Sequence, residues 1–234
     1  MIPIKTESAW KGTSNCRNCG IRDMVLFADL TEADFGLIHA PIDDLEFRAG
    51  NTLFQEGASA MGIFTLRAGM IKLMRSTSDG RQRIVRVLRP GDVAGMEALV
   101  AARYDTDAVA LSDASVCRIP LSVIHTLGLS SPRLQQRLME KWHRALKDAD
   151  DWLADLNFGS ARQRVCNFVL KMRSATDDQL VTLFSREDMG SMLNLKLETV
   201  SREVSALVRE GALQPLDKQG RMYRILNLNP LLPE

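Results

Sequence analysis

The feature that most constrains this chain is an amphipathic segment near its C-terminus, residues 194–211, which reads NLKLETVSREVSALVREG. Its apolar residues recur every three or four positions, the period of a helix with one buried face; they are Leu197, Val200, Val204, Leu207 and Val208. The other face carries a carboxylate, two hydroxyls and a guanidinium, at Glu198, Ser201, Ser205 and Arg202. A carboxylate can accept a hydrogen bond from cytosine N4, and a guanidinium can donate to O6 and N7 of guanine. The segment therefore predicts a helix that reads DNA in the major groove.

A second short helix is predicted just before this one. Ser185 is a candidate N-cap, and Asp188 stands three residues later, as in a weak capping box. Met189, Met192 and Leu193 then supply an apolar face. Asn194 is a residue that a tight turn tolerates, so the two helices are expected to form a helix-turn-helix.

The residues that follow predict a wing. Gly211 ends the second helix at the usual left-handed position. Residues 213–228 then read as two short strands around the turn Asp217-Lys218-Gln219-Gly220. The alternative interpretation is an ordinary helix pair with a charged face towards solvent. The predicted wing makes this alternative less favoured. The candidate phosphate contacts are the basic residues Arg186, Lys196, Arg209, Lys218 and Arg221.

The N-terminal half has the pattern of an all-β domain. Between residues 45 and 120, glycines at positions 50, 57, 69, 80 and 91 separate short apolar runs. The expected strands are residues 52–54, 62–66, 70–74, 84–88 and 115–119. Spacing this regular predicts an antiparallel barrel or jelly roll.

One long helix is expected over residues 131–156. Its apolar stripe consists of Leu134, Leu138, Trp142, Ala145, Ala149, Trp152 and Leu156. Such a stripe is long enough to pair with a second copy, which predicts a homodimer; packing on the chain's own barrel is the alternative. A dimer would place two reading helices one DNA turn apart, and so predicts a palindromic operator.

Composition excludes several classes of protein. The 234 residues suit two modest domains. No apolar run approaches the ~20 residues that span a bilayer, and residues 1–20 lack a signal-peptide core, so we expect a cytoplasmic protein with no membrane partner. The net charge of +1 excludes a polycation that coats DNA indiscriminately. The chain has no Gly-rich phosphate loop, nucleophile–base pair or metal-hydrolase motif, so an enzyme is not expected.

The sequence resembles the Crp/Fnr family of bacterial transcription regulators over nearly its whole length. The motifs are RAGNTLFQEG at 48–57, LRAGMIK at 66–72, LRPGD at 88–92 and ETVSR at 198–202. The resemblance implies an α+β fold with a cyclic-nucleotide-binding-like antiparallel β-barrel (jelly roll), a long dimerisation helix and a C-terminal winged helix-turn-helix. The implied domains are an N-terminal arm at 1–28, the barrel at 29–128, the dimerisation helix at 129–158 and the DNA-binding domain at 159–234.

The reading motif, Glu198-Thr199-Val200-Ser201-Arg202, is close to the FNR type. It implies a half-site like TTGAT, with Glu198 and Arg202 on the C·G and G·C pairs and Ser201 near a thymine. Leu197 occupies the position where the cyclic-AMP receptor type has Arg. Lys196 replaces the N-capping Thr of FNR-type helices, so we expect a weaker cap and a phosphate contact there.

The resemblance also bears on the ligand of the barrel. Cyclic-nucleotide pockets in this family have Gly-Glu on a short helix, and then an Arg that pairs with the cyclic phosphate. This chain has Gly95-Met96-Glu97, but Thr106 stands in place of the Arg and is followed by Asp107. Because an Asp repels a phosphate, we expect no cyclic nucleotide.

The cysteines suggest a different signal. Cys16 and Cys19 form a CxxC, which in a cytoplasmic protein points to metal or redox chemistry. The resemblance to FNR implies a [4Fe–4S] cluster held by Cys16, Cys19 and Cys117. The fourth cysteine would fall near Val25 or Phe27, so a non-cysteine ligand is required; the candidates are Asp23, Asp148, Asp150 and Asp151.

Two further interpretations of the cysteines remain open. Cys16 and Cys19 can form a thiol–disulfide switch, or all four cysteines are inert, with Cys117 and Cys166 as core residues. A regulator without a cluster would be thiol-controlled or constitutive, with the barrel serving as a contact for RNA polymerase.

The three histidines, at 39, 125 and 143, are isolated. Asp148, Asp150, Asp151 and Asp155 load the long helix with like charge, which is expected to oppose dimerisation until a signal repacks the helix.

Overall fold

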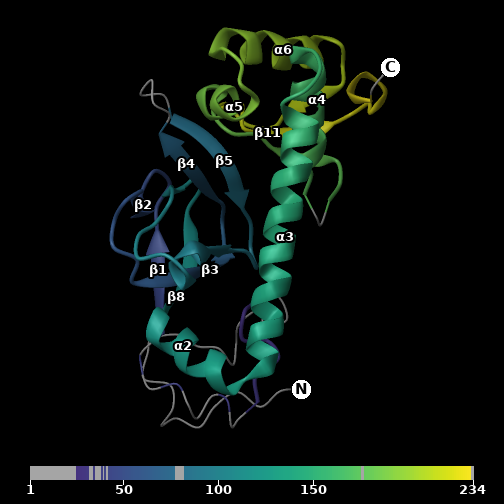
Figure 1. Cartoon of the computed structure of the whole chain (residues 1–234). Helices are drawn as coiled ribbons and strands as arrows, with labels where there is room; N and C mark the ends of the chain where they lie inside the picture. The colour runs from purple at the N-terminus through teal and green to yellow at the C-terminus, as the bar shows by residue number, and fades with distance from the viewer. Residues whose placement is uncertain are drawn as a thin grey trace. The chain divides into compact units, whose positions relative to one another are not determined.

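The computed structural model describes residues 25–31, 34, 38, 40, 42–76, 82–174 and 177–232. The chain forms two compact units: residues 1–81 with 85–146, and residues 82–84 with 147–234 (Figure 1). No helix within the described ranges is long and apolar enough to cross a membrane.

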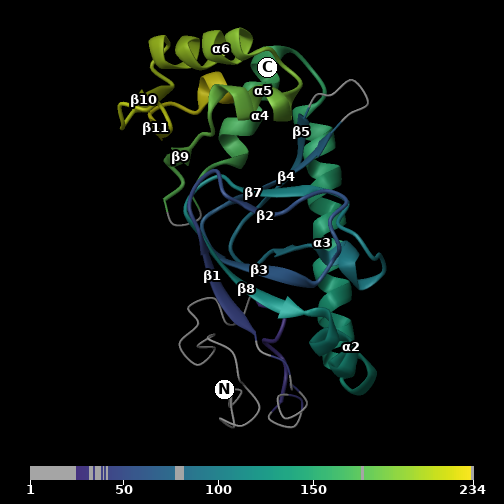
Figure 2. The same ribbon diagram turned by 90° about the vertical axis from the view of Figure 1, so that its left-hand side faces the viewer.

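The first unit contains two four-stranded antiparallel sheets (Figure 2). One has the strand order β1-β8-β3-β6 and the other β2-β7-β4-β5. The bounds are β1 Asp43–Phe47, β2 Thr52–Phe54, β3 Gly62–Ala68, β4 Ile71–Ser76, β5 Gln82–Leu88, β6 Val93–Ala94, β7 Asp107–Ala110 and β8 Ala114–Pro120. A short 3-10 helix, η3, covers Met96–Leu99. Each of the five strands predicted from the sequence is present.

The strands close around an apolar core that includes Ile63, Leu66, Ile71 and Val116. Gly69 shows why glycines punctuate this region. Its φ is +83°, and a Cβ there would lie 2.2 Å from the carbonyl oxygen of Asp113. Only glycine adopts this backbone without strain and allows the close approach that turns β3 into β4.

Two helices follow the strands: α2 at Leu121–Ser130 and α3 at Pro132–Leu156. The predicted long helix is therefore confirmed. Part of its predicted stripe faces the chain's own barrel, since Leu134 belongs to the barrel core and Leu138 and Trp142 pack against it. For these three residues the structure shows the alternative interpretation, packing on the chain's own barrel.

Other apolar residues of α3 are exposed: Met139, Leu146 and Leu153. The inner face also holds a buried lysine, Lys141, whose Nζ donates to the carbonyl of Gly91 at 2.5 Å. Burial lowers the pKa of Lys141 to about 8. The helix thus has one face fixed to the barrel and another face that exposes apolar side chains.

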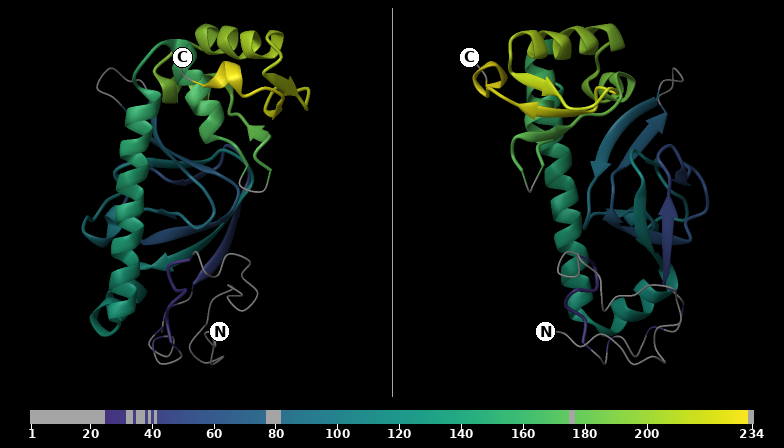
Figure 3. Two further views of the ribbon diagram at one scale, coloured as in Figure 1. Left: turned by 90° about the vertical axis from the view of Figure 1, so that its right-hand side faces the viewer. Right: turned by 180° about the vertical axis from the view of Figure 1, so that it is seen from behind.

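The second unit is built from α4 Ala161–Lys171, β9 Leu180–Thr182, α5 Arg186–Leu193, α6 Leu197–Arg209, β10 Leu213–Pro215, β11 Met222–Ile225 and η4 Asn229–Leu231. Ser160 and Gln163 form a full capping box at the start of α4. The strands form one antiparallel sheet in the order β10-β11-β9, so the predicted wing is present. Figure 3 shows its yellow hairpin strands alongside the green helices.

The core of this unit lies between its helices. Phe168 of α4 is fully buried and meets the rings of Phe184 and Trp152 edge-on, at centroid distances of 5.3 and 6.4 Å. Cys166 is also buried, as expected of a core residue, and burial raises the pKa of its thiol.

Candidate nucleic-acid interface

The first helix of the pair begins where the sequence predicts. The hydroxyl of Ser185 accepts a hydrogen bond from the backbone N–H of Asp188 at 3.0 Å. The same hydroxyl donates to the Asp188 carboxylate at 2.8 Å. Ser185 is therefore the N-cap of α5, and it satisfies one of the N–H groups that a helix start leaves unpaired.

The turn between the helices depends on two residues. Asn194 adopts a left-handed backbone with φ 53°, and its N–H donates to the carbonyl of Gly190. A Cβ on Gly190 would lie 2.7 Å from the carbonyl oxygen of Leu195. Asn194 was predicted from the sequence as the turn residue, whereas Gly190 was not. A glycine inside a helical pattern was the signal that could have shown it.

The second helix, α6, buries one face against its neighbours. Val200, Val204 and Leu207 are buried, as predicted, and Val208 is half-buried. Leu197 is 47% exposed, so its assignment to the buried face was wrong. It is the first residue of α6 and stands nearly one turn before Val200, where burial begins.

The opposite face of α6 presents polar side chains to solvent. Glu198, Arg202 and Ser205 are exposed, while Thr199 and Ser201 are half-buried. Glu198 and Arg202 are four residues apart, so they lie one helical turn apart on the same face. The Arg202 guanidinium bonds the carboxylate of Glu203 at 3.3 Å. This arrangement can offer a carboxylate and a guanidinium to adjacent base pairs.

The start of α6 has no side-chain cap. Lys196 is the N-cap residue, and its side chain makes no capping hydrogen bond. The weaker cap expected from Lys at this position is therefore present. Lys196 is exposed. A helix N-terminus with a nearby cation favours a phosphate, because unpaired N–H groups and the helix dipole act together.

Arg186 has a partner that sequence reasoning missed. Its Nη2 donates to the hydroxyl of Tyr223 at 2.7 Å, and its guanidinium carbon lies 5.9 Å from the centre of the Tyr223 ring. Tyr223 is buried in wing strand β11. The contact holds the guanidinium between the wing and the start of α5. A tyrosine at an inward position of the wing was the only signal in the sequence.

The region expected to reject a cyclic nucleotide lies in the first unit. Asp107 accepts a hydrogen bond from the backbone N–H of Glu56 at 2.8 Å. The guanidinium of Arg103 donates to the carbonyl of Gly57 at 2.5 Å. Tyr104 stacks on Phe54 with ring centres 3.9 Å apart. The expectation that no cyclic nucleotide binds remains a prediction.

The candidate metal ligands are only partly within the described residues. Cys16, Cys19 and Asp23 lie outside them. Cys117 is half-buried on β8, and its Sγ donates to Oδ1 of Asp44 at 3.3 Å. In the described ranges, no group of three or more His, Cys, Asp and Glu side chains could hold a metal.

Two of the aspartates on α3 that were considered as ligands or as sources of repulsion have cationic partners. Asp151 pairs with Lys147 at 2.6 Å, and Asp155 pairs with Lys171 at 2.7 Å. Asp150 is exposed.

Comparison with known proteins agrees with this architecture. Residues 44–130 match the cyclic nucleotide-binding domain, and residues 163–232 match the Crp-like helix-turn-helix domain. The chain is 26% identical over 225 residues to the transcriptional activator protein FnrA of Stutzerimonas stutzeri, covering 92% of this chain and 89% of that protein. It is 28% identical over 189 residues to the transcriptional regulatory protein btr of Bordetella pertussis, covering 78% of each.

Solved structures show the same fold. FixK2 from Bradyrhizobium japonicum superposes with a TM-score of 0.72 at 26% identity, over 82% of this chain and 96% of that one. A barrel of the cyclic-nucleotide-binding kind followed by a winged helix-turn-helix defines a DNA-binding transcription regulator rather than an enzyme. The chain belongs to the Crp/Fnr family of transcription regulators.

Proposed function

We propose that this regulator binds a palindromic, FNR-like operator as a homodimer. The observation that carries the proposal is the exposed face of α6, where Glu198 and Arg202 stand one turn apart opposite a buried face. Glu198 and Arg202 read the C·G and G·C pairs of a TTGAT-like half-site, and Ser201 lies near a thymine. Arg186, Lys196 and Thr199 complete the DNA contacts, with the two basic residues on phosphates.

The exposed face of α3 supports the homodimer. Met139, Leu146 and Leu153 are seven residues apart, and His143 and Asp150 occupy the intermediate positions of the same heptad seam. Exposed apolar side chains at this spacing are typical of a helix that pairs with a second copy. Pairing along this seam brings the two reading helices onto one operator.

The signal is proposed to be oxygen or redox state, sensed through a [4Fe–4S] cluster on Cys16, Cys19 and Cys117. Among the described residues, Cys117 is a half-buried cysteine, and cysteine thiolates are the usual ligands of such a cluster. A relative named FnrA adds support. When bound, the cluster would be the group that oxygen or another oxidant attacks. Cys16, Cys19 and Cys117 would hold it as thiolates.

A second candidate is a regulator with no cluster and no cyclic nucleotide, controlled by the Cys16–Cys19 thiols or constitutive. The observation that favours it is the missing fourth cysteine of the FNR pattern, since Val25 and Phe27 stand where that cysteine would fall. In either case we expect RNA polymerase as a partner and a cytoplasmic location.

Two measurements test the proposal. Footprinting on a palindrome of two TTGAT half-sites should show protection that is lost when the G·C pair of each half-site is replaced. Equal protection of both DNAs would contradict sequence-specific reading. On protein purified without oxygen, about four irons per chain, with sulfide, would support the cluster. Iron-free protein with full operator binding would contradict the cluster and support the second candidate, the regulator without one.

A further inference from the structure

Two arginines of α4 contact the two ends of the segment that carries the reading helix. Arg162 forms an ion pair with the carboxylate of Glu210, the C-cap residue of α6. Nη1 of Arg164 donates to the carbonyl oxygen of Leu193 at 2.9 Å, at the end of α5 and just before the turn that leads into α6. The two arginines are two residues apart, so their side chains leave α4 about 200° apart around its axis. They therefore point to opposite sides of α4.

Glu210 is unfavourably placed for the stability of its own helix. A carboxylate at a helix C-terminus opposes the helix dipole, whereas a cation there is favourable. The guanidinium of Arg162 supplies that cation from another helix, with 29% of its side chain exposed. The ion pair thus fixes the C-terminal end of α6 to α4, the helix against which α6 packs.

Arg164 fixes the other end. The last carbonyls of a helix have no partner within that helix, and the carbonyl of Leu193 receives its partner from α4. The Nε of Arg164 is buried and has no hydrogen-bond partner among the described residues. Since buried donors are nearly always paired, the contact with Leu193 rather than solvation holds this guanidinium. The N–H groups of Asn194 and Leu195 both donate to the carbonyl of Gly190, so holding the end of α5 also holds the turn.

The helix that carries both arginines is itself tied to the last turn of α3. The side-chain amide of Asn167 donates to the carbonyl of Asp155 at 2.8 Å, and Lys171 pairs with the Asp155 carboxylate at 2.7 Å. Asn167 and Lys171 are four residues apart, so they lie on one face of α4. Side chains of α4 therefore connect the end of α3 to both ends of the reading helix.

We propose that Arg162 and Arg164 are positioning residues, which set the angle at which α6 presents its reading face to DNA. The inference rests on the proposed function, in which Glu198 and Arg202 read base pairs. A bidentate contact with a base depends strictly on direction, whereas phosphate contacts position the protein without reading sequence. Neither arginine was singled out from the sequence, because their partners lie 48 and 29 residues away.

The test measures discrimination, the ratio of affinities for the operator and for an operator changed at the G·C pair, in the full-length chain. Arg162→Gln and Arg164→Met each remove one contact and keep most of the side chain. Each should lower discrimination by about fivefold or more, because a misdirected helix weakens a base contact that accounts for about 5–150-fold. Affinity for the changed operator should change little.

The matched control is Arg173→Gln. Arg173 pairs with Asp178 in the same unit at 2.6 Å, and its side chain is 30% exposed, close to the 29% of Arg162. This variant loses a similar ion pair and should leave discrimination unchanged. Equal losses of affinity for both DNAs in Arg162→Gln and Arg164→Met would overturn the inference.

Exchanging the two charges separates positioning from stability. Glu210→Arg alone should lower discrimination, because two guanidinium groups then repel. Combining it with Arg162→Glu should restore discrimination, because the ion pair forms again with its charges exchanged. Chemical unfolding of the same variants measures stability. A double variant that regains stability but not discrimination would overturn the inference.

Amide hydrogen exchange on the free protein tests the two contacts without DNA. Arg162→Gln should speed exchange at the C-terminal end of α6, and Arg164→Met should speed it at Asn194 and Leu195. Unchanged exchange in both variants overturns the inference, whichever DNA the protein reads. If exchange responds as expected but the unchanged protein does not discriminate between the two DNAs, the proposed operator reading fails, while the two arginines still hold α6.

Discussion

The reading residue Arg202 has a partner within its own helix when DNA is absent. Its guanidinium bonds the carboxylate of Glu203 at 3.3 Å, and two-thirds of its side chain is exposed. An exposed pair of this kind contributes little to stability, so DNA can displace it at small cost. Arg202 is therefore held near the reading face without being locked there.

Replacing Arg202 with Ala should cost roughly 1–3 kcal/mol of discrimination at one base pair, because a bidentate contact with guanine is lost. The measurement is the ratio of affinities for the operator and for an operator changed at the G·C pair. The matched control is Lys196→Ala, which should weaken binding to both DNAs equally and reduce the dependence on salt. A uniform loss in Arg202→Ala would mean that Arg202 contacts only phosphate.

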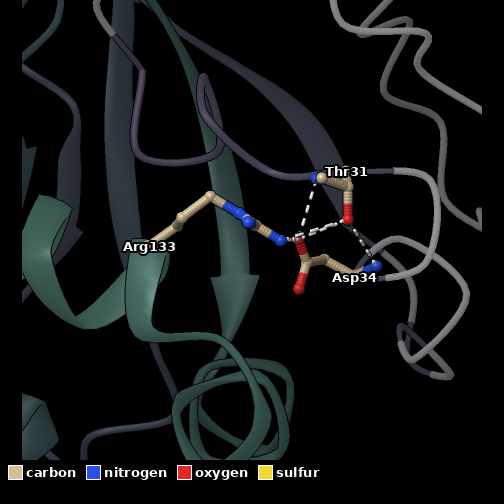
Figure 4. Close-up of polar contacts among 3 residues, drawn as sticks. All are labelled: Thr31, Asp34 and Arg133. Carbon is tan, nitrogen blue, oxygen red and sulfur yellow. Dashed lines mark hydrogen bonds and ion pairs between the residues drawn. The ribbon is translucent and has the colours of Figure 1, made fainter.

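A second residue-scale network joins the segment before the barrel to α3 (Figure 4). One carboxylate oxygen of Asp34 accepts from the N–H and the hydroxyl of Thr31, each at 2.8 Å, and from Nη2 of Arg133 at 3.1 Å. Burial alone raises the pKa of Asp34, but these hydrogen bonds outweigh it and lower the pKa to about 2. The charged form is thus the one that the fold stabilises.

The lowered pKa of Asp34 makes a prediction about stability and pH. A carboxyl with a depressed pKa stabilises the fold above its unfolded pKa of about 4, and that contribution is lost as the pH falls through about 2. Asp34→Asn should lower the free energy of unfolding by about 2 kcal/mol at pH 7. Chemical unfolding of the first unit at pH 7 and pH 3 tests this. An equal loss in the free energy of unfolding at both pH values would show that ionisation of Asp34 is not the cause.

Among the elements, the wing and α5 are joined by a contact between residues that are distant in sequence and meet only in the folded unit. Tyr223 of β11 accepts from Arg186 at 2.7 Å, and Gly220 stands close by, since a Cβ there would lie 3.2 Å from the Tyr223 hydroxyl oxygen. The wing therefore orients a basic side chain at the start of α5. This is a positioning role for Tyr223, because the residue itself is buried.

Replacing Tyr223 with Phe keeps the ring and removes only the hydroxyl. The free energy of unfolding should fall by about 1 kcal/mol or less, since one hydrogen bond is lost. Operator affinity should fall a few-fold, and by the same factor on every DNA, because Arg186 is expected to contact phosphate. The comparison is with Arg186→Ala. In the double variant, Tyr223→Phe should cause little further loss of operator affinity beyond that of Arg186→Ala alone. Additive losses in the double variant would show that the two residues act separately.

How much of these elements the sequence predicts depends on whether the signal is local. The period of 3.6 in α6, the N-cap at Ser185 and the glycines of the barrel act within a few residues, and the structure confirms them. The contacts Tyr223–Arg186 and Asp44–Cys117 join residues 37 and 73 apart, so no local pattern shows them. Leu197 was misassigned because periodicity alone does not show where along a helix packing begins.

At the scale of the whole molecule, α3 is the element on which the proposed dimer depends. Its inner face is occupied, because Leu134, Leu138 and Trp142 pack on the barrel core and Lys141 bonds Gly91. The proposed heptad seam of Met139, Leu146 and Leu153 is exposed. A change in the barrel that shifts the inner face would therefore move the seam of a dimer as well.

Asp150 is the acidic residue whose effect on the dimer can be predicted most sharply. It lies in the heptad seam between Leu146 and Leu153, whereas Asp151 pairs with Lys147 at 2.6 Å. In a parallel pair, equivalent seam positions face each other, so two Asp150 carboxylates would repel. Asp150→Ala should tighten dimerisation of the metal-free protein by about 5–150-fold, the range of a 1–3 kcal/mol coupling. Sedimentation velocity across a dilution series measures this, with Asp151→Ala as the control expected to change it less. An unchanged association constant for Asp150→Ala would place the seam elsewhere on the helix.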